Sequence, residues 1–153
     1  YGAELARKYR LPEAIVRGIL EHHGTLRVGF FYQQAVERYG AENVREEEYR
    51  YPGPRPQRPE TAILMICDAS ESGVRTLDHP TEEDVHAFVR RIMDMRVNDG
   101  QFDECNLTLR QLHLIEDVVV RGVMGTLHTR IRYPNLVAAS VPVPAAAKPT
   151  EGK

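Results

Sequence analysis

The chain lacks tryptophan and has only two cysteines, Cys67 and Cys105, among its 153 residues. Two cysteines are too few for the disulfide scaffold of a small secreted domain, so we expect a protein of the reducing cytoplasm. Its 20 basic and 22 acidic side chains nearly cancel, which gives a formal charge of −2. A dedicated nucleic-acid-binding domain usually carries a basic excess. Composition therefore argues against both of these classes.

Long apolar runs are also absent. No stretch approaches the roughly 18 consecutive apolar residues that a membrane-spanning helix needs. Hydrophobic residues make up 42% of the chain and charged residues 27%, as in an ordinary globular domain with a substantial core. The first residue is Tyr1 rather than methionine, and the opening already follows a helical pattern. We therefore expect the chain to begin inside a longer protein.

What the sequence does contain is a series of helices separated by glycine and proline. Apolar residues at helical spacing predict helices near residues 3–10, 12–23, 28–39, 60–77, 81–97 and 108–128. Thr81 with Asp84, and Thr108 with Gln111, have the spacing of capping boxes at the start of the last two helices. No strand alternation and no internal repeat are visible. The sequence therefore predicts an all-α fold.

Two segments lack this pattern. Residues 41–58 are rich in proline and arginine, and a plain linker is one interpretation of that composition. We predict instead an ordered connection that packs across the bundle, anchored by Tyr49 and Tyr51. After Pro134 the chain is rich in alanine and proline, which predicts a disordered tail over residues 135–153. The folded domain would then cover residues 1–134.

Two adjacent histidines, His22 and His23, end the second predicted helix just before Gly24. Neighbouring side chains within a helix diverge by about 100°, but a helix end relaxes and lets both imidazoles point to one place. Histidine also favours helix C-termini because imidazolium complements the helix dipole. From these residues alone, a metal site and a simple helix cap both remain open.

Asp68 follows the apolar stretch TAILMIC, so we expect its helix to be buried nearly all round. A buried carboxylate needs compensation. Arg75, two helical turns further on, is one candidate partner, and a metal ion held by distant histidines is the other. Cys67 is expected to pack as a small hydrophobic residue.

Four blocks of the chain resemble consecutive segments of one family. They read LARKYRLPEAIVRGILEHHGT, FFYQQAVERYG, YRYPGPRPQRPETAILMICDASESGVRTL and DGQFDECNLTLRQLHLIEDVVVRGVMGTLHTRIRYP. Together they resemble the HD-superfamily phosphohydrolase domain of bacterial seven-transmembrane receptors, whose members hydrolyse cyclic di-AMP. The resemblance runs from Tyr1 to Pro134. It implies a helical bundle of the HD type, truncated at its N-terminus.

The resemblance also implies a site with two divalent metal ions, manganese or iron. Carried onto this chain, His22 and His23 match adjacent ligand histidines, and Asp68 matches a later aspartate ligand. The other family ligands, including the His-Asp pair that names the superfamily, have no counterpart here. No catalytic residue beyond the metal ligands is implied. Arg75 is a further candidate, either to orient Asp68 or to bind a substrate phosphate.

Two such ions can activate water and stabilise the leaving oxygen of a phosphodiester. The implied reaction is therefore hydrolysis of cyclic di-AMP to the linear dinucleotide. The implied partners are this cyclic dinucleotide and the missing N-terminal half of the HD domain, with no nucleic-acid polymer. The membrane would enter only through the absent transmembrane part, which would place the domain on the cytoplasmic face of the bacterial membrane.

Two other functions remain open. One is a degenerate HD bundle that acts as a regulatory or nucleotide-binding module without turnover, and the other is a diverged hydrolase with a different substrate. We expect the chain on its own to be inactive because it holds only part of the ligand set. We also expect it to expose apolar faces around Ile15 and Ile19 and around Leu64 and Met65.

Overall fold

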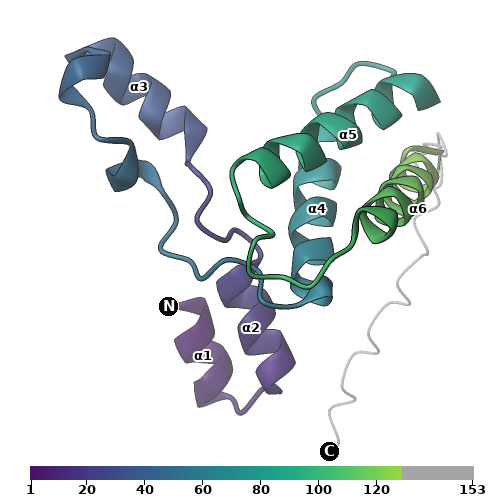
Figure 1. Cartoon of the computed structure of the whole chain (residues 1–153), viewed down its shortest axis with the longest axis horizontal. Helices are drawn as coiled ribbons and strands as arrows, with labels where there is room; N and C mark the ends of the chain where they lie inside the picture. Colours follow the sequence, from purple (N-terminus) through teal and green to yellow (C-terminus); the bar gives the residue numbers. More distant parts are fainter. Residues whose placement is uncertain (129–153) are drawn as a thin grey trace, which may run out of the picture.

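The computed structural model describes residues 1–128, which form α-helices joined by loops and two short 3-10 helices (Figure 1). No strand forms in this part of the chain, so the predicted all-α class is confirmed. The predicted tail over residues 135–153 and the end of the predicted domain lie outside the described residues. The elements are α1 (Gly2–Lys8), α2 (Glu13–Glu21), α3 (Gly29–Tyr39), η1 (Ala41–Asn43), η2 (Glu46–Tyr49), α4 (Pro59–Val74), α5 (Glu82–Asn98) and α6 (Leu109–His128).

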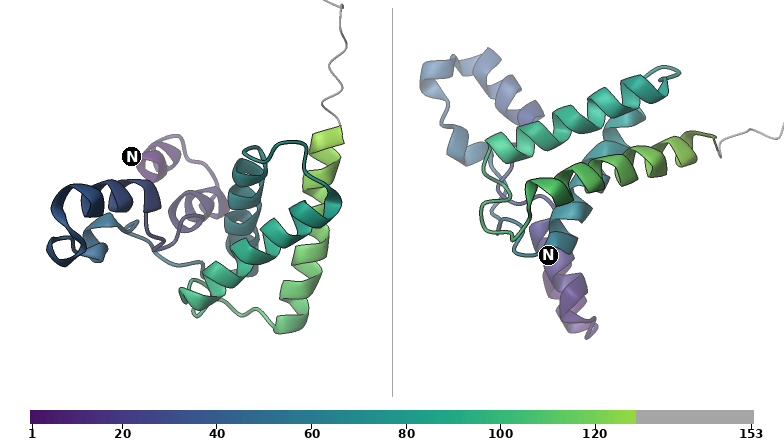
Figure 2. Two further views of the ribbon diagram at one scale, coloured as in Figure 1. Left: turned by 90° about the horizontal axis from the view of Figure 1, so that it is seen from above. Right: turned by 45° about the vertical axis from the view of Figure 1, so that its right-hand side comes forward.

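The main core lies among α4, α5 and α6, which pack against one another (Figures 1 and 2). Met65 and Ile66 of α4 are fully buried there, together with Val85 and Val89 of α5. Val119, Val120 and Val123 supply the buried side of α6. A smaller cluster between α1 and α2 contains Ala3, Ala6 and Val16, and α2 also packs on α4.

Both predicted capping boxes are present. Thr81 Oγ1 accepts a hydrogen bond from the Asp84 amide at 3.2 Å, and the Asp84 carboxylate accepts one from the Thr81 amide at 2.9 Å. Thr108 and Gln111 exchange the same pair of bonds at 3.3 and 2.9 Å. Each pair satisfies amide groups that a helix start would otherwise leave without partners.

Helix α3, with η1 and η2, stands away from the α4–α6 core as an arm (Figures 1 and 2). A short antiparallel pairing joins the base of the arm: the Val28 amide donates to the Tyr49 carbonyl, and the Tyr51 amide donates to the Leu26 carbonyl. The Tyr49 ring packs edge-on against Tyr32 of α3. Residues 41–49 therefore fold along α3, not across the bundle as predicted.

The second half of the proline-rich segment does cross the bundle. Pro56 is fully buried. The buried Glu21 carboxylate accepts hydrogen bonds from the Gln57 amide at 3.0 Å and from the Thr61 hydroxyl at 2.6 Å. Because these bonds tie the segment to α2 and to the first turn of α4, residues 50–58 form an ordered connection.

Helix α4 is not buried nearly all round, contrary to our expectation. Ile63 and Leu64 are 37% and 44% exposed, because in the described chain only α2, α5 and α6 cover this helix. The predicted exposure of Ile15 and Ile19 is also observed, at 49% and 36%. Met65, however, is buried, because it projects about 100° away from Leu64 and into the core. None of the helices over residues 1–128 is long and apolar enough to cross a membrane.

Candidate functional site

His22, His23 and Asp68 line one pocket of about 830 Å³. The pocket lies among the end of α2, the beginning of α3, the middle of α4 and the last turns of α5. The structure thus brings together two histidines and an aspartate that lie 45 residues apart in sequence. Their role as metal ligands remains a prediction.

His22 is the C-cap of α2, and its ring is fixed by the helix itself. Its Nδ1 lies 2.8 Å from the Gly18 carbonyl oxygen, which can only accept a hydrogen bond. Nδ1 must therefore carry the proton, which leaves Nε2 with a free lone pair. A metal-binding histidine is commonly oriented by a bond of this kind. The helix-cap and metal-ligand interpretations of His22 are therefore compatible.

The His23 ring lies between two other rings. Its centroid is 4.0 Å from that of His22 and 4.4 Å from that of Tyr51, on which it stacks. Burial lowers the pKa of His23, and the neighbouring His22 lowers it further, while Asp68 opposes the shift. The lowered pKa favours the neutral imidazole, which is the form that binds metals.

Gly24, which follows the histidines, permits the turn that places them. Its φ of +52° is in the left-handed region, where side chains are disfavoured. A Cβ atom here would lie 2.3 Å from Gln101 Oε1 and 2.9 Å from Met65 Cε. The chain passes too close to the core at this point for any larger residue.

Asp68 is exposed toward the pocket, and within residues 1–128 its side chain makes no hydrogen bond or ion pair. Its electrostatic neighbours are His23 and Arg96. The alternative in which Arg75 neutralises Asp68 is wrong, because Arg75 forms its ion pair with Glu71 on the exposed side of α4. Arg75 lines a different cavity, with Asp78 and His79, and does not reach the His22–Asp68 pocket.

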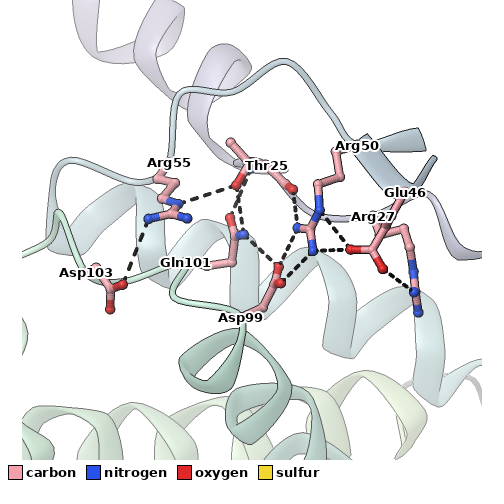
Figure 3. Close-up of polar contacts among 8 residues, drawn as sticks. All are labelled: Thr25, Arg27, Glu46, Arg50, Arg55, Asp99, Gln101 and Asp103. Atoms are coloured by element: carbon pink, nitrogen blue, oxygen red, sulfur yellow. Dashed lines mark hydrogen bonds and ion pairs between the residues drawn. The ribbon is translucent and has the colours of Figure 1, made fainter. Parts of the chain in front are cut away.

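Arg50 and Asp99 also line the pocket, and they belong to a bonded polar network (Figure 3). The Arg50 guanidinium donates to both carboxylate oxygens of Asp99, at 2.9 and 3.1 Å, and also to Glu46 and to the Thr25 carbonyl. Gln101 is fully buried: its amide nitrogen donates to Asp99 and to the Thr25 hydroxyl, and its Oε1 accepts from the Thr25 amide. The Arg50 hydrogen bond lowers the pKa of Asp99 below its usual value.

Sequence reasoning missed this network. Arg50 and Asp99 are 49 residues apart, and no periodic pattern relates two such positions. The available signal was that Arg50, Asp99 and Gln101 all lie within the blocks that carry the family resemblance. The network joins the base of the α3 arm to the end of α5, so it fixes one side of the pocket.

The candidate ligands suit a metal ion in kind, but they are not grouped as closely as a metal site requires. Two imidazoles and one carboxylate are donors that divalent iron and manganese accept. Among the described residues, however, no three His, Cys, Asp or Glu side chains are grouped closely enough to hold an ion. These residues therefore fit a contribution to a metal site rather than a whole one.

Curated proteins with similar sequences exist in several bacteria. Cyclic-di-AMP phosphodiesterase PgpH of Bacillus subtilis is 40% identical over 133 residues, which are 87% of this chain and 18% of that protein. Cyclic-di-AMP phosphodiesterase PgpH of Listeria monocytogenes is 37% identical over 134 residues, again 18% of its length. The chain thus spans less than a fifth of the curated relatives it matches. No family model matches it.

The fold is similar to a solved structure as well. The crystal structure of the L. monocytogenes PgpH HD domain in complex with cyclic di-AMP superposes with a TM-score of 0.77 at 36% sequence identity. The match covers 82% of this chain and 57% of the crystallised one. The predicted resemblance to the HD phosphohydrolase domain is therefore confirmed.

Proposed function

From its homology to the PgpH HD domain, we propose that the chain forms part of a phosphodiesterase that hydrolyses cyclic di-AMP to the linear dinucleotide. The observation that carries this proposal is the shared pocket of His22, His23 and Asp68. These side chains line one pocket although two of them follow the end of α2 and the third comes from α4. The activity belongs to a parent protein in which the rest of the HD domain is present.

In this proposal His22, His23 and Asp68 are donors to a site of two divalent ions, manganese or iron. The remaining donors come from the part of the HD domain that this chain does not contain. Bound ions would supply an activated water and stabilise charge on the phosphodiester. The chain's own residues set the geometry: the Gly18 carbonyl orients His22, and Tyr51 supports the ring of His23.

The same pocket has surfaces that suit a cyclic dinucleotide. Phe30 at the start of α3 is 68% exposed, and Met95 on α5 is also exposed toward the pocket. Apolar and aromatic side chains of this kind can stack on nucleobases. Ions held at His22, His23 and Asp68 would attract the phosphates at another part of the pocket. We therefore infer that bases and phosphates contact different parts of one pocket.

A second function rests on the family resemblance alone. It is a degenerate HD bundle that binds a nucleotide or a partner without turnover. Such a module would keep the pocket and the fold but not the hydrolysis. By the family resemblance, either form of the parent protein would hold this domain on the cytoplasmic face of the bacterial membrane.

The two functions differ in whether cyclic di-AMP is converted to a linear product. We expect the purified parent protein, supplied with Mn²⁺ or Fe²⁺, to convert cyclic di-AMP to the linear dinucleotide, which chromatography separates from the substrate. EDTA should stop the reaction, and added metal should restore it. Binding of intact cyclic di-AMP with no linear product under any metal would contradict the enzyme and support the regulatory module.

A further inference from the structure

Three arginines reach the pocket, and two of them already have partners. Arg50 is held by Asp99 and Glu46, and Arg27 donates to Glu46 at 2.9 Å while its guanidinium lies over the Tyr32 ring. Each of these two arginines is paired with a carboxylate of the chain (Figure 3). They therefore position the α3 arm and have little capacity left for a ligand.

Arg96, on the last turns of α5, is different. It lines the pocket together with His23 and Asp68 and is itself partly buried. Its Nε atom is shielded from solvent and has no hydrogen-bond partner, and within the described chain its guanidinium forms no ion pair. Nε is covered by the chain, but Arg96 lines the pocket and no described carboxylate pairs with it, so the rest of its guanidinium is left to bind an acceptor that is not among these residues.

The electrostatic surroundings of Arg96 fit an anion. Burial lowers its pKa, and the charges of Asp99 and Asp68 oppose that shift. Guanidinium nevertheless keeps its proton in proteins. Asp99 is occupied by Arg50 and Gln101, and Asp68 is a proposed metal ligand, so neither carboxylate is available as a direct partner.

We propose that Arg96 binds a non-bridging phosphate oxygen of the cyclic dinucleotide, beside the proposed metal ligands. This inference rests on the proposed function and names a substrate-binding residue for it. A planar guanidinium offers paired donors to two phosphate oxygens, and such charge-assisted bonds are among the strongest in proteins. The transition state of hydrolysis also carries negative charge on those oxygens, which the guanidinium would stabilise.

The alternative is that Arg96 only positions Asp68, and the experiment must distinguish this role from phosphate binding. If Arg96 acted only by holding Asp68 in place, its loss would reduce metal content first and affect substrate only through the metal. If it binds phosphate, its loss weakens substrate binding even without metal. Metal-free binding and metal content therefore distinguish the two roles.

The test uses the parent protein with Arg96→Gln, Arg96→Lys and the matched control Arg91→Gln. Arg91 is an exposed arginine of the same helix that lies over the Phe88 ring, outside the pocket. For each variant we would measure the Kd for cyclic di-AMP in EDTA, kcat/KM with metal, metal content and Tm. Arg96→Gln removes one charge-assisted contact, so it should raise the Kd for cyclic di-AMP in EDTA about 10- to 100-fold. Arg96→Lys should recover part of this, and Arg91→Gln should match the wild type.

Equal metal-free affinities of the wild type and Arg96→Gln would overturn the proposal, as would a loss confined to metal content. If Arg96→Gln lowers Tm, the comparison of Arg96→Lys with the wild type decides instead. Turnover by the wild type is read separately. If the wild type binds cyclic di-AMP but does not hydrolyse it, the proposed reaction is refuted. The role of Arg96 is then decided by the metal-free affinities alone.

Discussion

The two walls of the pocket differ in how completely their polar groups are bonded. The bonded wall consists of Arg50 and Asp99, which line the pocket, and of Thr25 and Gln101 behind them, and each of these side chains is held by at least one of the others. The open wall consists of His22, His23, Asp68 and Arg96. There, the only side-chain hydrogen bond in the described chain is the one from His22 to its own helix.

This difference separates structural from functional polar residues. The groups of the bonded wall satisfy one another, so their contribution is to join the α3 arm to the end of α5. The groups of the open wall keep donors and acceptors that the described chain does not use. Retaining such groups costs stability, and they are typical of sites that bind something else.

The contrast between the two walls would be wrong if the open wall alone held both metal ions and supported hydrolysis. We expect residues 1–153, purified alone with Mn²⁺ or Fe²⁺, to show no detectable hydrolysis of cyclic di-AMP, because they supply too few donors for two ions. The parent protein assayed in parallel is the positive control. Comparable turnover by the two proteins would show that the described residues suffice.

Breaking the bonded wall should cost stability. Arg50→Met removes the partner of Asp99 and of the Thr25 carbonyl at once. We expect the free energy of unfolding of the parent domain to fall by about 2–4 kcal/mol, as measured by urea denaturation. Arg45→Met is the matched control, because Arg45 is an exposed arginine beside η2 with only a loose ion pair to Glu48. Equal effects of the two substitutions would contradict the structural role of the network.

The bonded wall should also respond to acid. The pKa of Asp99 is lowered in the folded protein, chiefly by the Arg50 hydrogen bond, so the unfolded chain binds its proton more readily. The stabilising contribution of Asp99 is therefore present above the unfolded pKa, about 4, and is lost as pH falls through the folded value. We expect the stability difference between the wild type and Asp99→Asn to be largest above pH 5 and to shrink below pH 4. A stability difference between the two proteins that grows as the pH falls would contradict a lowered pKa of Asp99.

The smallest effect is expected at Cys67, which neighbours Asp68 but belongs to neither wall. Cys67 packs against the α4–α6 core, and burial raises the pKa of its thiol. Cys67→Ala should cost about 1 kcal/mol or less through a small cavity, with metal content and turnover unchanged. A loss of activity without a loss of stability would place Cys67 in the site.

Local features of the fold could be predicted from sequence because they depend on residues close together in the chain. The capping boxes at Thr81 and Thr108 are examples. The exposed face of α4 could not, because an apolar run such as TAILMIC does not state which sides other helices cover. Met65 and Leu64 are adjacent and equally apolar, yet only Met65 faces the core.

The candidate site was predictable only in part. His22, His23 and Asp68 were named by family resemblance, and the fold places them at one pocket. The partner of Arg75 was not predictable, because Glu71 and Asp68 both lie on its side of the helix and only geometry selects Glu71. Arg96 lacks a partner because the nearby Asp99 is bound by Arg50, which lies 49 residues before Asp99 in the sequence.

The most direct test of the central claim is a paired measurement of metal content and cyclic di-AMP turnover in the parent protein carrying Asp68→Asn. Glu71→Gln is the matched control, because Glu71 lies one turn away on the same helix and outside the pocket. Since Asp68 is proposed to bind metal directly, we predict that Asp68→Asn loses bound metal and at least about 100-fold of the turnover, while Glu71→Gln retains both. Wild-type metal content and turnover in Asp68→Asn would contradict the account.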